Sequence, residues 1–141
     1  MKKIVYSLSF LVLLYSCSNI DKGATSSDND IDAARNFIQA ALNDDFDKAG
    51  TFMLDDSVNR EDLALLRRLS RERLSDEDRK KYKEASIRIH ERRPLNDSTS
   101  LIFFSNSYKN KKDSLRVVRT DKKWYVDLKY IFPHQIDSLP K

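Results

Sequence analysis

The sequence has few of the residues that build phosphate-binding loops and disulfide frameworks. Its 141 residues include only two glycines, Gly23 and Gly50, and one cysteine, Cys17. Loops that cradle phosphate groups need several closely spaced glycines, so the sequence excludes a P-loop and a dinucleotide-binding fingerprint. A single cysteine cannot form a disulfide within the chain.

The composition is that of one soluble, packed domain. Charged residues make up 34% of the chain and hydrophobic residues 40%, a balance that differs from that of disordered tails. The length of 141 residues is enough for one domain of ordinary size. The net charge is +4, and positive and negative residues are mixed along the chain.

The first sixteen residues have the pattern of a secretory signal peptide. Two lysines precede a mostly apolar run from Ile4 to Leu14, and the small residue Ser16 follows. This run is too short to span a bilayer core, which needs roughly 20 helical residues. A positive segment, a short apolar segment and a small residue are typical of a signal peptide. Residues 1–16 are therefore predicted to be removed, which lowers the net charge to +2.

The segment "LYSC" ends this apolar run at the only cysteine. It resembles a bacterial lipobox, with Leu14, Ser16 and Cys17 at the minus-three, minus-one and plus-one positions. In lipoproteins with this motif, the thiol receives a diacylglycerol, the peptidase cleaves before the cysteine, and the new amine is usually acylated. The resemblance implies that Cys17 is the lipidation site, and two or more acyl chains hold a protein stably on a membrane. The alternative is an ordinary secreted protein with a free thiol.

Lipidation of Cys17 would place the protein in the cell envelope. The expected location is a membrane surface, with the outer membrane favoured and the domain on its periplasmic or outer face. No free thiol would remain in the mature chain, which excludes both disulfides and thiol catalysis. Residues 17–30 are rich in Ser, Asp and Asn, cannot bury a core, and are predicted to form a flexible tether. The folded domain is then expected at residues 31–141.

Helices are predicted in the first half of this domain. Apolar residues recur at helical spacing from Ile31 to Leu42, with Asp30 as the expected N-cap. A second short helix is expected to start at Asp45 or Asp47.

The long charged segment 59–85 carries a stripe of leucines. Ser75 followed three residues later by Asp78 is typical of a new helix cap. This segment is therefore predicted to form either one long third helix or two helices with a break near Ser75.

Strand periodicity replaces helical periodicity from Ile87 onward. The expected strands are separated by polar turns at 94–98, 109–113 and 121–123, and strands joined by such short turns must pair antiparallel. The last strand is expected to cover 124–132. Helices followed by such strands predict an α+β domain, with N-terminal helices packed on a curved four-stranded antiparallel sheet.

This element order resembles the nuclear-transport-factor-two-like fold, also called the cystatin-like cone. The resemblance rests on "DAARNFIQAALNDDFDKAGTFM" before the charged segment and "RVVRTDKKWYVDL" near the end, and it covers residues 31–131. It is closest to small lipoproteins of unknown function that have this fold. Trp124 is expected to lie buried against the helices, with Phe37 and Leu66 among its neighbours.

Two functions follow from the resemblance. The fold implies a pocket where the concave sheet face meets the helices, and its members include steroid isomerases, polyketide cyclases and many non-catalytic proteins. The expected function is a non-catalytic binding or interaction module, with the concave face filled mainly by apolar and aromatic side chains that leave a small cavity or none. The alternative is a small isomerase or cyclase-type enzyme that uses a pocket on the concave sheet face. The expected partner is an unidentified protein or a small apolar ligand. A homodimer through the sheet is a further expectation.

No catalytic residue is predicted from the motifs. The isomerase reaction needs an Asp base and an oxyanion hole, and the sheet offers only Asp127, on the face opposite Trp124. Asp127 neighbours Arg116 and Lys129 in the expected sheet, which predicts a solvent-facing ion pair.

Metal, cofactor and nucleic-acid sites are not predicted either. His90 and His134 are far apart and lack metal-ligand spacing, so His90 is expected at the surface of the first strand. In residues 67–83, acidic and basic side chains interleave as on a solvated helix. Nucleic-acid binding would need an unneutralised basic face with aromatic platforms.

Overall fold

The computed structural model describes residues 27–131. The predicted signal peptide, Cys17 and His134 lie outside this range. The described chain is an α+β domain in which four helices precede a four-stranded antiparallel sheet of order β1–β2–β3–β4. The elements are α1 (Asp30–Leu42), α2 (Phe46–Gly50), α3 (Ser57–Arg73), α4 (Asp76–Lys83), β1 (Ile87–Asn96), β2 (Thr99–Asn106), β3 (Asp113–Thr120), β4 (Lys123–Asp127) and the 3₁₀ helix η1 (Leu128–Tyr130).

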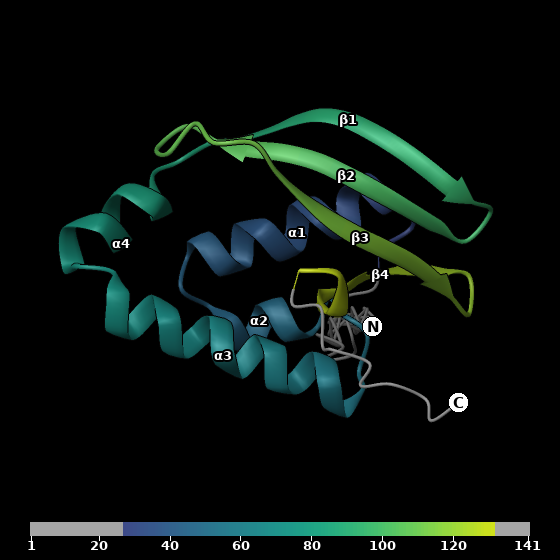
Figure 1. Ribbon diagram of the computed structural model, residues 1–141, viewed down its shortest axis with the longest axis horizontal. Coiled ribbons are helices and arrows are strands. Elements are labelled where there is room, and N and C mark those ends of the chain that lie inside the picture. The colour runs from purple at the N-terminus through teal and green to yellow at the C-terminus, as the bar shows by residue number, and fades with distance from the viewer. Residues whose placement is uncertain (1–26, 132–141) are drawn as a thin grey trace, which may run out of the picture.

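The layers are arranged around α1. Figure 1 shows the sheet bending over α1, with α2 and α3 on the other side of this helix and α4 at one end of the domain. Helix α1 contacts all four strands, whereas α3 reaches the sheet end through η1. The curved antiparallel sheet and its helical cover, both predicted from the sequence, are therefore confirmed.

The core fills the concave face of the sheet. Trp124 is 8% exposed and belongs to one buried cluster with Phe37, while Leu66 is partly buried at the border of the cluster. The buried position predicted for Trp124 is thus confirmed. The strands supply a further set of inward-facing apolar side chains: Ile102, Leu115, Val117, Val126 and Leu128.

Side-chain caps set the helix starts. The Asn29 side chain accepts a hydrogen bond from the Asp32 amide at 2.8 Å, so Asn29 is the N-cap of α1 and the prediction of Asp30 was wrong by one residue. Asp30 is instead the first helical residue, buried and paired with Arg92 Nε at 2.5 Å. A carboxylate in the first turn is favoured by the helix dipole.

Of the two alternatives for residues 59–85, the structure shows two helices, with a break between α3 and α4. The Ser75 hydroxyl accepts from the Asp78 amide at 3.0 Å, and the Asp78 carboxylate accepts in return from the Ser75 amide at 3.3 Å. This reciprocal pair is a capping box, which satisfies two otherwise unpaired backbone donors. Of the two candidates for the start of α2, Asp45 is the N-cap.

Two strand boundaries differ from the sequence expectation. β1 continues through Pro94 to Asn96 with two bulges, and an edge strand tolerates proline because an outward-facing N–H needs no partner in the sheet. The last strand ends at Asp127 instead of residue 132. The Leu128 amide leaves the strand ladder and donates to Asn59 Oδ1 at 2.7 Å, so a 3₁₀ turn follows.

The folded domain begins before residue 31. Ser27 is buried and forms an antiparallel bridge with Trp124, whose amide donates to the Ser27 carbonyl at 3.0 Å. Ser27 and the three residues after it, predicted as the end of a flexible tether, therefore belong to the domain. The prediction failed because polar residues that lack a hydrophobic pattern still pair with a strand edge through their backbone.

Candidate binding pocket between the helices

A pocket of about 320 Å³ lies between α1, α3 and α4. Its lining comes from the four helices and the segments that join them, without any strand residue. The pocket is lined by Ala41, Leu42, Asp44, Phe46, Leu66, Leu69, Ser70, Arg73, Leu74, Arg79 and Tyr82.

From the sequence, the concave sheet face is expected to be filled mainly by apolar and aromatic side chains, and only the enzyme alternative places an open pocket there. The concave face is occupied by α1, whose Ala33, Ala34 and Phe37 are buried in the sheet core. The helical pocket lies instead among the end of α1, the C-terminal half of α3 and α4.

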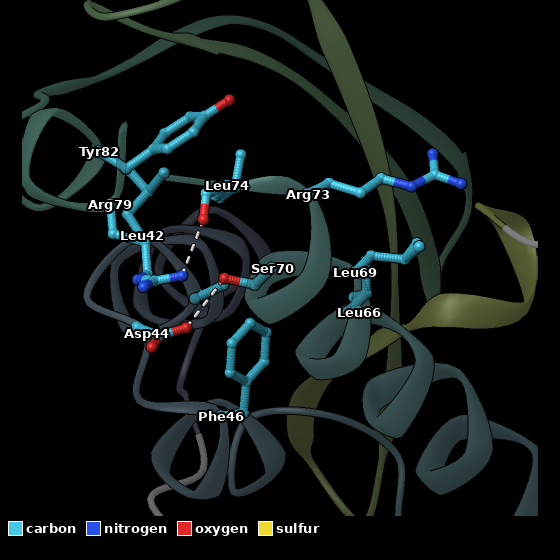
Figure 2. A pocket seen from close by; sticks show the side chains of 11 residues that line it. Leu42, Asp44, Phe46, Leu66, Leu69, Ser70, Arg73, Leu74, Arg79 and Tyr82 are labelled. Carbon is cyan, nitrogen blue, oxygen red and sulfur yellow. Dashed lines mark hydrogen bonds between the residues drawn. The ribbon is translucent and has the colours of Figure 1, made fainter. Parts of the chain in front are cut away.

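The walls of the pocket are mainly apolar. Leu66 and Leu69 belong to the leucine stripe of α3, Leu42 ends α1, and all three are only partly buried. Phe46 lies at the base in Figure 2, below Ser70. Apolar side chains that stay partly exposed in a concave site gain free energy when a ligand covers them.

The polar side chains in one part of the lining form hydrogen bonds with other protein groups. Arg79 Nη1 donates to the Leu74 carbonyl at 2.9 Å, and Arg79 Nη2 pairs with Asp76. The Ser70 hydroxyl donates to Asp44 Oδ1 at 2.9 Å. Figure 2 shows both hydrogen bonds on one side of the pocket and the Arg73 side chain extending away from them.

These pocket residues were not predicted from the sequence. The interleaved charges of residues 67–83 indicated a solvated face, and none of Asp44, Ser70, Arg79 and Tyr82 was predicted as a site residue. The signal within the segment is the set of apolar residues among the charges, at 69, 74 and 82. Their alignment with the end of α1 depends on the angle at the break near Ser75, which the sequence pattern does not specify.

The position of Asp127 differs from the sequence prediction. It was expected to point to solvent, but its side chain is only 6% exposed. Arg116 Nη2 donates to Asp127 Oδ2 at 2.6 Å, so the predicted ion-pair partner was correct. The carboxylate is buried because the start of α3 and η1 cover the end of β4, and Asn59 Nδ2 lies 3.5 Å from Asp127 Oδ1. Asp127 does not line the helical pocket.

A polar cluster joins α3 to the end of the sheet around this carboxylate. Asn59 is fully buried and donates to Asp56 Oδ2 at 2.9 Å, and Lys129 Nζ donates to the same oxygen at 2.7 Å. The backbone N–H of Asn59, which donates to Asp56 Oδ1 at 2.9 Å, and the ammonium of Lys129 lower the pKa of Asp56 to about 2. The hydrogen bond to Asp56 raises the pKa of Lys129. These groups satisfy one another, which is the arrangement of a structural contact.

This cluster predicts an acid sensitivity of the fold. The folded-state pKa of Asp56, about 2, lies below the value of 3.8 for an unperturbed Asp side chain. Its contribution to stability is therefore complete above pH 4 and is lost as the pH falls toward 2. Asp56→Asn is expected to flatten the loss of unfolding free energy between pH 4 and pH 2, measured by urea unfolding at each pH. Asp97→Asn, at an exposed turn, makes the same charge change and is expected to keep the wild-type slope. An unaltered slope in Asp56→Asn would contradict the assignment.

His90 is exposed on β1, as expected, and its Nε2 lies 2.8 Å from Ser105 Oγ. Among residues 27–131, no group of three or more His, Cys, Asp or Glu side chains is placed to hold a metal ion. Within the same range, no helix has both the length and the apolar character needed to cross a membrane.

Comparison of the chain with protein-family models, with curated proteins and with solved structures finds no significant match.

Proposed function

We propose that this protein is a lipid-anchored lipoprotein of the cell envelope whose domain binds a small apolar ligand in the helical pocket without catalysing a reaction. The carrying observation is the apolar pocket of about 320 Å³, in which Arg79, Asp44 and Ser70 are held by hydrogen bonds to other protein groups. Ligand pockets are typically concave, largely preformed and apolar, with a few placed polar groups, and start at about this volume.

The nuclear-transport-factor-two-like cone is the fold that we propose for the domain. This proposal is supported by the element order, in which four helices precede a bent antiparallel sheet of four consecutive strands. Fold resemblance does not by itself transfer activity, so the function rests on the pocket.

A binding role is favoured over the isomerase alternative because both candidate carboxylates, Asp127 and Asp44, already accept hydrogen bonds from other side chains. A general base must reach the substrate proton within hydrogen-bonding distance. Asp127 lies outside the pocket and is engaged by Arg116. Asp44 does line the pocket, and its Oδ1 already accepts the Ser70 hydroxyl. An enzyme would instead require a free carboxylate that faces the open space.

The membrane anchor is tested at Cys17. Cys17→Ser is expected to abolish incorporation of a labelled fatty acid and to release the protein from the membrane fraction, or to leave it unprocessed, because the serine hydroxyl does not accept the diacylglycerol. Ser18→Ala, at the neighbouring position, is the control and is expected to behave like the wild type. Full membrane retention of Cys17→Ser would contradict the anchor.

The pocket is tested with an uncharged chain. Decanol is expected to shift the amide NMR signals of the residues that line the pocket in the full chain. Leu69→Trp fills the apolar wall and should abolish these shifts. Leu95→Trp is the matched control, because Leu95 is exposed on β1, away from the pocket. Shifts that persist in Leu69→Trp, or their absence in the wild type, would contradict a binding role for the pocket.

A further inference from the structure

We infer that the protein has a second ligand site, where β1 begins and β2 ends, which binds a small tetrahedral oxyanion such as a phosphate or sulfate group. The site is a polar pocket of about 190 Å³ that shares no residue with the helical pocket. Three observations carry this inference, namely the charge of the lining, the hydrogen-bond donors that the protein leaves unused, and the rigid frame that holds them. The polar pocket is lined by Ser86, Arg88, Ser105, Ser107 and Asn110.

The polar pocket lies on the outer face of the sheet. Arg88 and Ser105 are partners across the antiparallel strands β1 and β2, so their side chains lie on the same face. The neighbouring residues Ile87 and Ile89 pack against the core, which directs Arg88 outward. Asn110 belongs to the turn between β2 and β3, and Figure 1 shows this turn beside the start of β1, at the end of the domain that carries α4.

The charge of the lining selects an anion. Among the residues that line the polar pocket, Arg88 carries the only charge. Within residues 27–131 its guanidinium group has no ion-pair partner. Two other arginines on the outer face of the sheet are already neutralised, because Arg93 pairs with Glu91 and Arg116 pairs with Asp127. An anionic ligand would supply the counter-charge that Arg88 lacks.

The turn between β2 and β3 adds positive charge beside the polar pocket. It carries Lys109, Lys111 and Lys112, and no acidic residue occurs in it before β3 begins at Asp113. None of these three lysines forms an ion pair in the part of the chain that the structure describes. Positive charges beside a concave site attract anions and increase the rate at which they arrive.

Most hydrogen-bond donors of the lining are unused. In the described part of the chain, no hydrogen bond is formed by the Arg88 guanidinium, the Ser86 hydroxyl or the Asn110 side-chain amide. The Ser107 hydroxyl accepts from the Ser86 amide at 3.0 Å, which leaves its own O–H group free to donate. The Ser105 hydroxyl is the exception, because it pairs with the histidine of β1. In the helical pocket, by contrast, the serine hydroxyl is already bonded to a carboxylate.

Backbone and side-chain hydrogen bonds hold these donors in place. The Ser107 amide donates to the Ser86 carbonyl at 2.9 Å, which ties the start of β1 to the end of β2. The Asn106 side chain accepts from the Lys109 amide at 2.9 Å, and the Asn110 amide donates to the Asn106 carbonyl at 2.9 Å. Because the turn is fixed before binding, less conformational entropy is lost when a ligand arrives.

The size of the polar pocket fits one compact group. Its volume is about 190 Å³, and a water molecule occupies about 30 Å³ in the liquid, so the space holds on the order of six non-hydrogen atoms. A phosphate or sulfate group fits this space, and its oxygens can accept hydrogen bonds from donors on several sides. An apolar chain would find no aliphatic or aromatic residue in the described lining.

Titrations with sodium phosphate and sodium sulfate test the site in the full chain. The ionic strength is kept constant with sodium chloride, so chloride is the control anion, and binding is followed by amide NMR signals. Both oxyanions are expected to shift the signals of residues 86–88 and 105–110 saturably and to bind about tenfold more tightly than chloride, because charge-assisted hydrogen bonds to oxyanions are strong. The absence of a saturable shift, or equal shifts with chloride, would overturn the inference.

Glycerol 3-phosphate distinguishes the source of the group. An affinity equal to that of inorganic phosphate would support a phosphate group carried by a larger molecule, because the pocket opens at exposed residues that leave room for a substituent. A clearly weaker affinity would support the free ion as the ligand. Binding of the ester that shifts signals elsewhere in the domain, and not those of the polar pocket, would overturn the assignment of the site.

Variants assign the binding to Arg88. Arg88→Gln is expected to weaken phosphate binding about tenfold or more, since hydrogen bonds to a charged group are lost. Arg93→Gln is the matched control, because Arg93 is exposed on the same strand and does not line the polar pocket. Asn110→Gly removes the side-chain amide and suits the left-handed backbone at φ 53°. It is expected to weaken binding about threefold to tenfold, which corresponds to one hydrogen bond.

The outcomes separate this site from the proposed function. An equal loss of phosphate affinity in Arg88→Gln and Arg93→Gln would reduce the effect to general surface charge and overturn the inference. The urea midpoint of Arg88→Gln is expected to match the wild type, because Arg88 is exposed. Leu69→Trp, which fills the helical pocket, should leave phosphate binding unchanged. Loss of decanol binding alone therefore contradicts the proposed function, and loss of phosphate binding alone contradicts the second site.

Discussion

Trp124→Ala is expected to lower the free energy of unfolding by about 3–5 kcal/mol, the usual cost of removing a large aromatic side chain from a core. The Trp124 side chain is 8% exposed and lies in the cluster that joins α1 to the sheet. Its removal leaves a cavity between these layers. A loss of this size is a large part of the 5–15 kcal/mol that stabilises a typical small domain.

The effect of Trp124→Ala is measured by urea unfolding followed by far-ultraviolet circular dichroism, because the variant lacks the only tryptophan. Tyr125→Ala is the control, since Tyr125 is the next residue, points to the opposite face of the sheet and is only partly buried. A smaller loss is expected there. Equal losses in the two variants, or an unchanged midpoint for Trp124→Ala, would show that Trp124 does not support the core.

The elements that the sequence predicted well are those with local signals. The apolar spacing of α1, the Ser75 and Asp78 capping box and the short polar turns between strands all act within a few residues. Such patterns depend on local backbone geometry and on which face is buried. They therefore sufficed to predict the helical first half with a possible break near Ser75, the antiparallel sheet and the burial of Trp124.

The errors lie where distant segments meet. The end of β4 and the burial of Asp127 both depend on Asn59, which is 68 residues away from Asp127 in the sequence. No local pattern marks that contact. The "DLKY" segment that follows Val126 continues the strand alternation in the sequence, yet tertiary hydrogen bonds convert its last three residues to a 3₁₀ turn.

The helical pocket was not predicted, for a similar reason. The leucines that line it were recognised as an apolar stripe, but a stripe does not show which part of it meets another element. Leu63 packs against the core, Leu66 packs against the core and also lines the pocket, and Leu69 lines the pocket. Which leucine meets which element is decided by tertiary packing, which helical periodicity does not encode.

Asn59→Ala is expected to cost about 2–4 kcal/mol, although it removes only one small polar side chain. Asn59 is fully buried, accepts from the Leu128 amide at 2.7 Å and donates to Asp56 at 2.9 Å. The alanine variant leaves the Leu128 amide without its acceptor, and each unsatisfied buried group costs about 1–3 kcal/mol. Asn43→Ala, at an exposed position after α1, is the control and is expected to change the urea midpoint little.

Asn59→Asp shows whether the donor groups of this amide matter as well as its acceptor. The new carboxylate keeps an oxygen for the Leu128 amide, but it would lie beside the carboxylates of Asp56 and Asp127, which contact the amide nitrogen of Asn59 in the wild type. Burial and like charge raise the pKa of such a group in the folded state above its unfolded value of about 3.9. The folded variant therefore binds a proton more tightly, and its stability relative to the wild type rises as the pH falls from 7 toward 4. We expect Asn59→Asp to be less stable than Asn59→Ala at pH 7, with the difference shrinking by pH 4.5. A constant difference across this range would mean that the end of β4 is held to α3 by the Leu128 hydrogen bond alone.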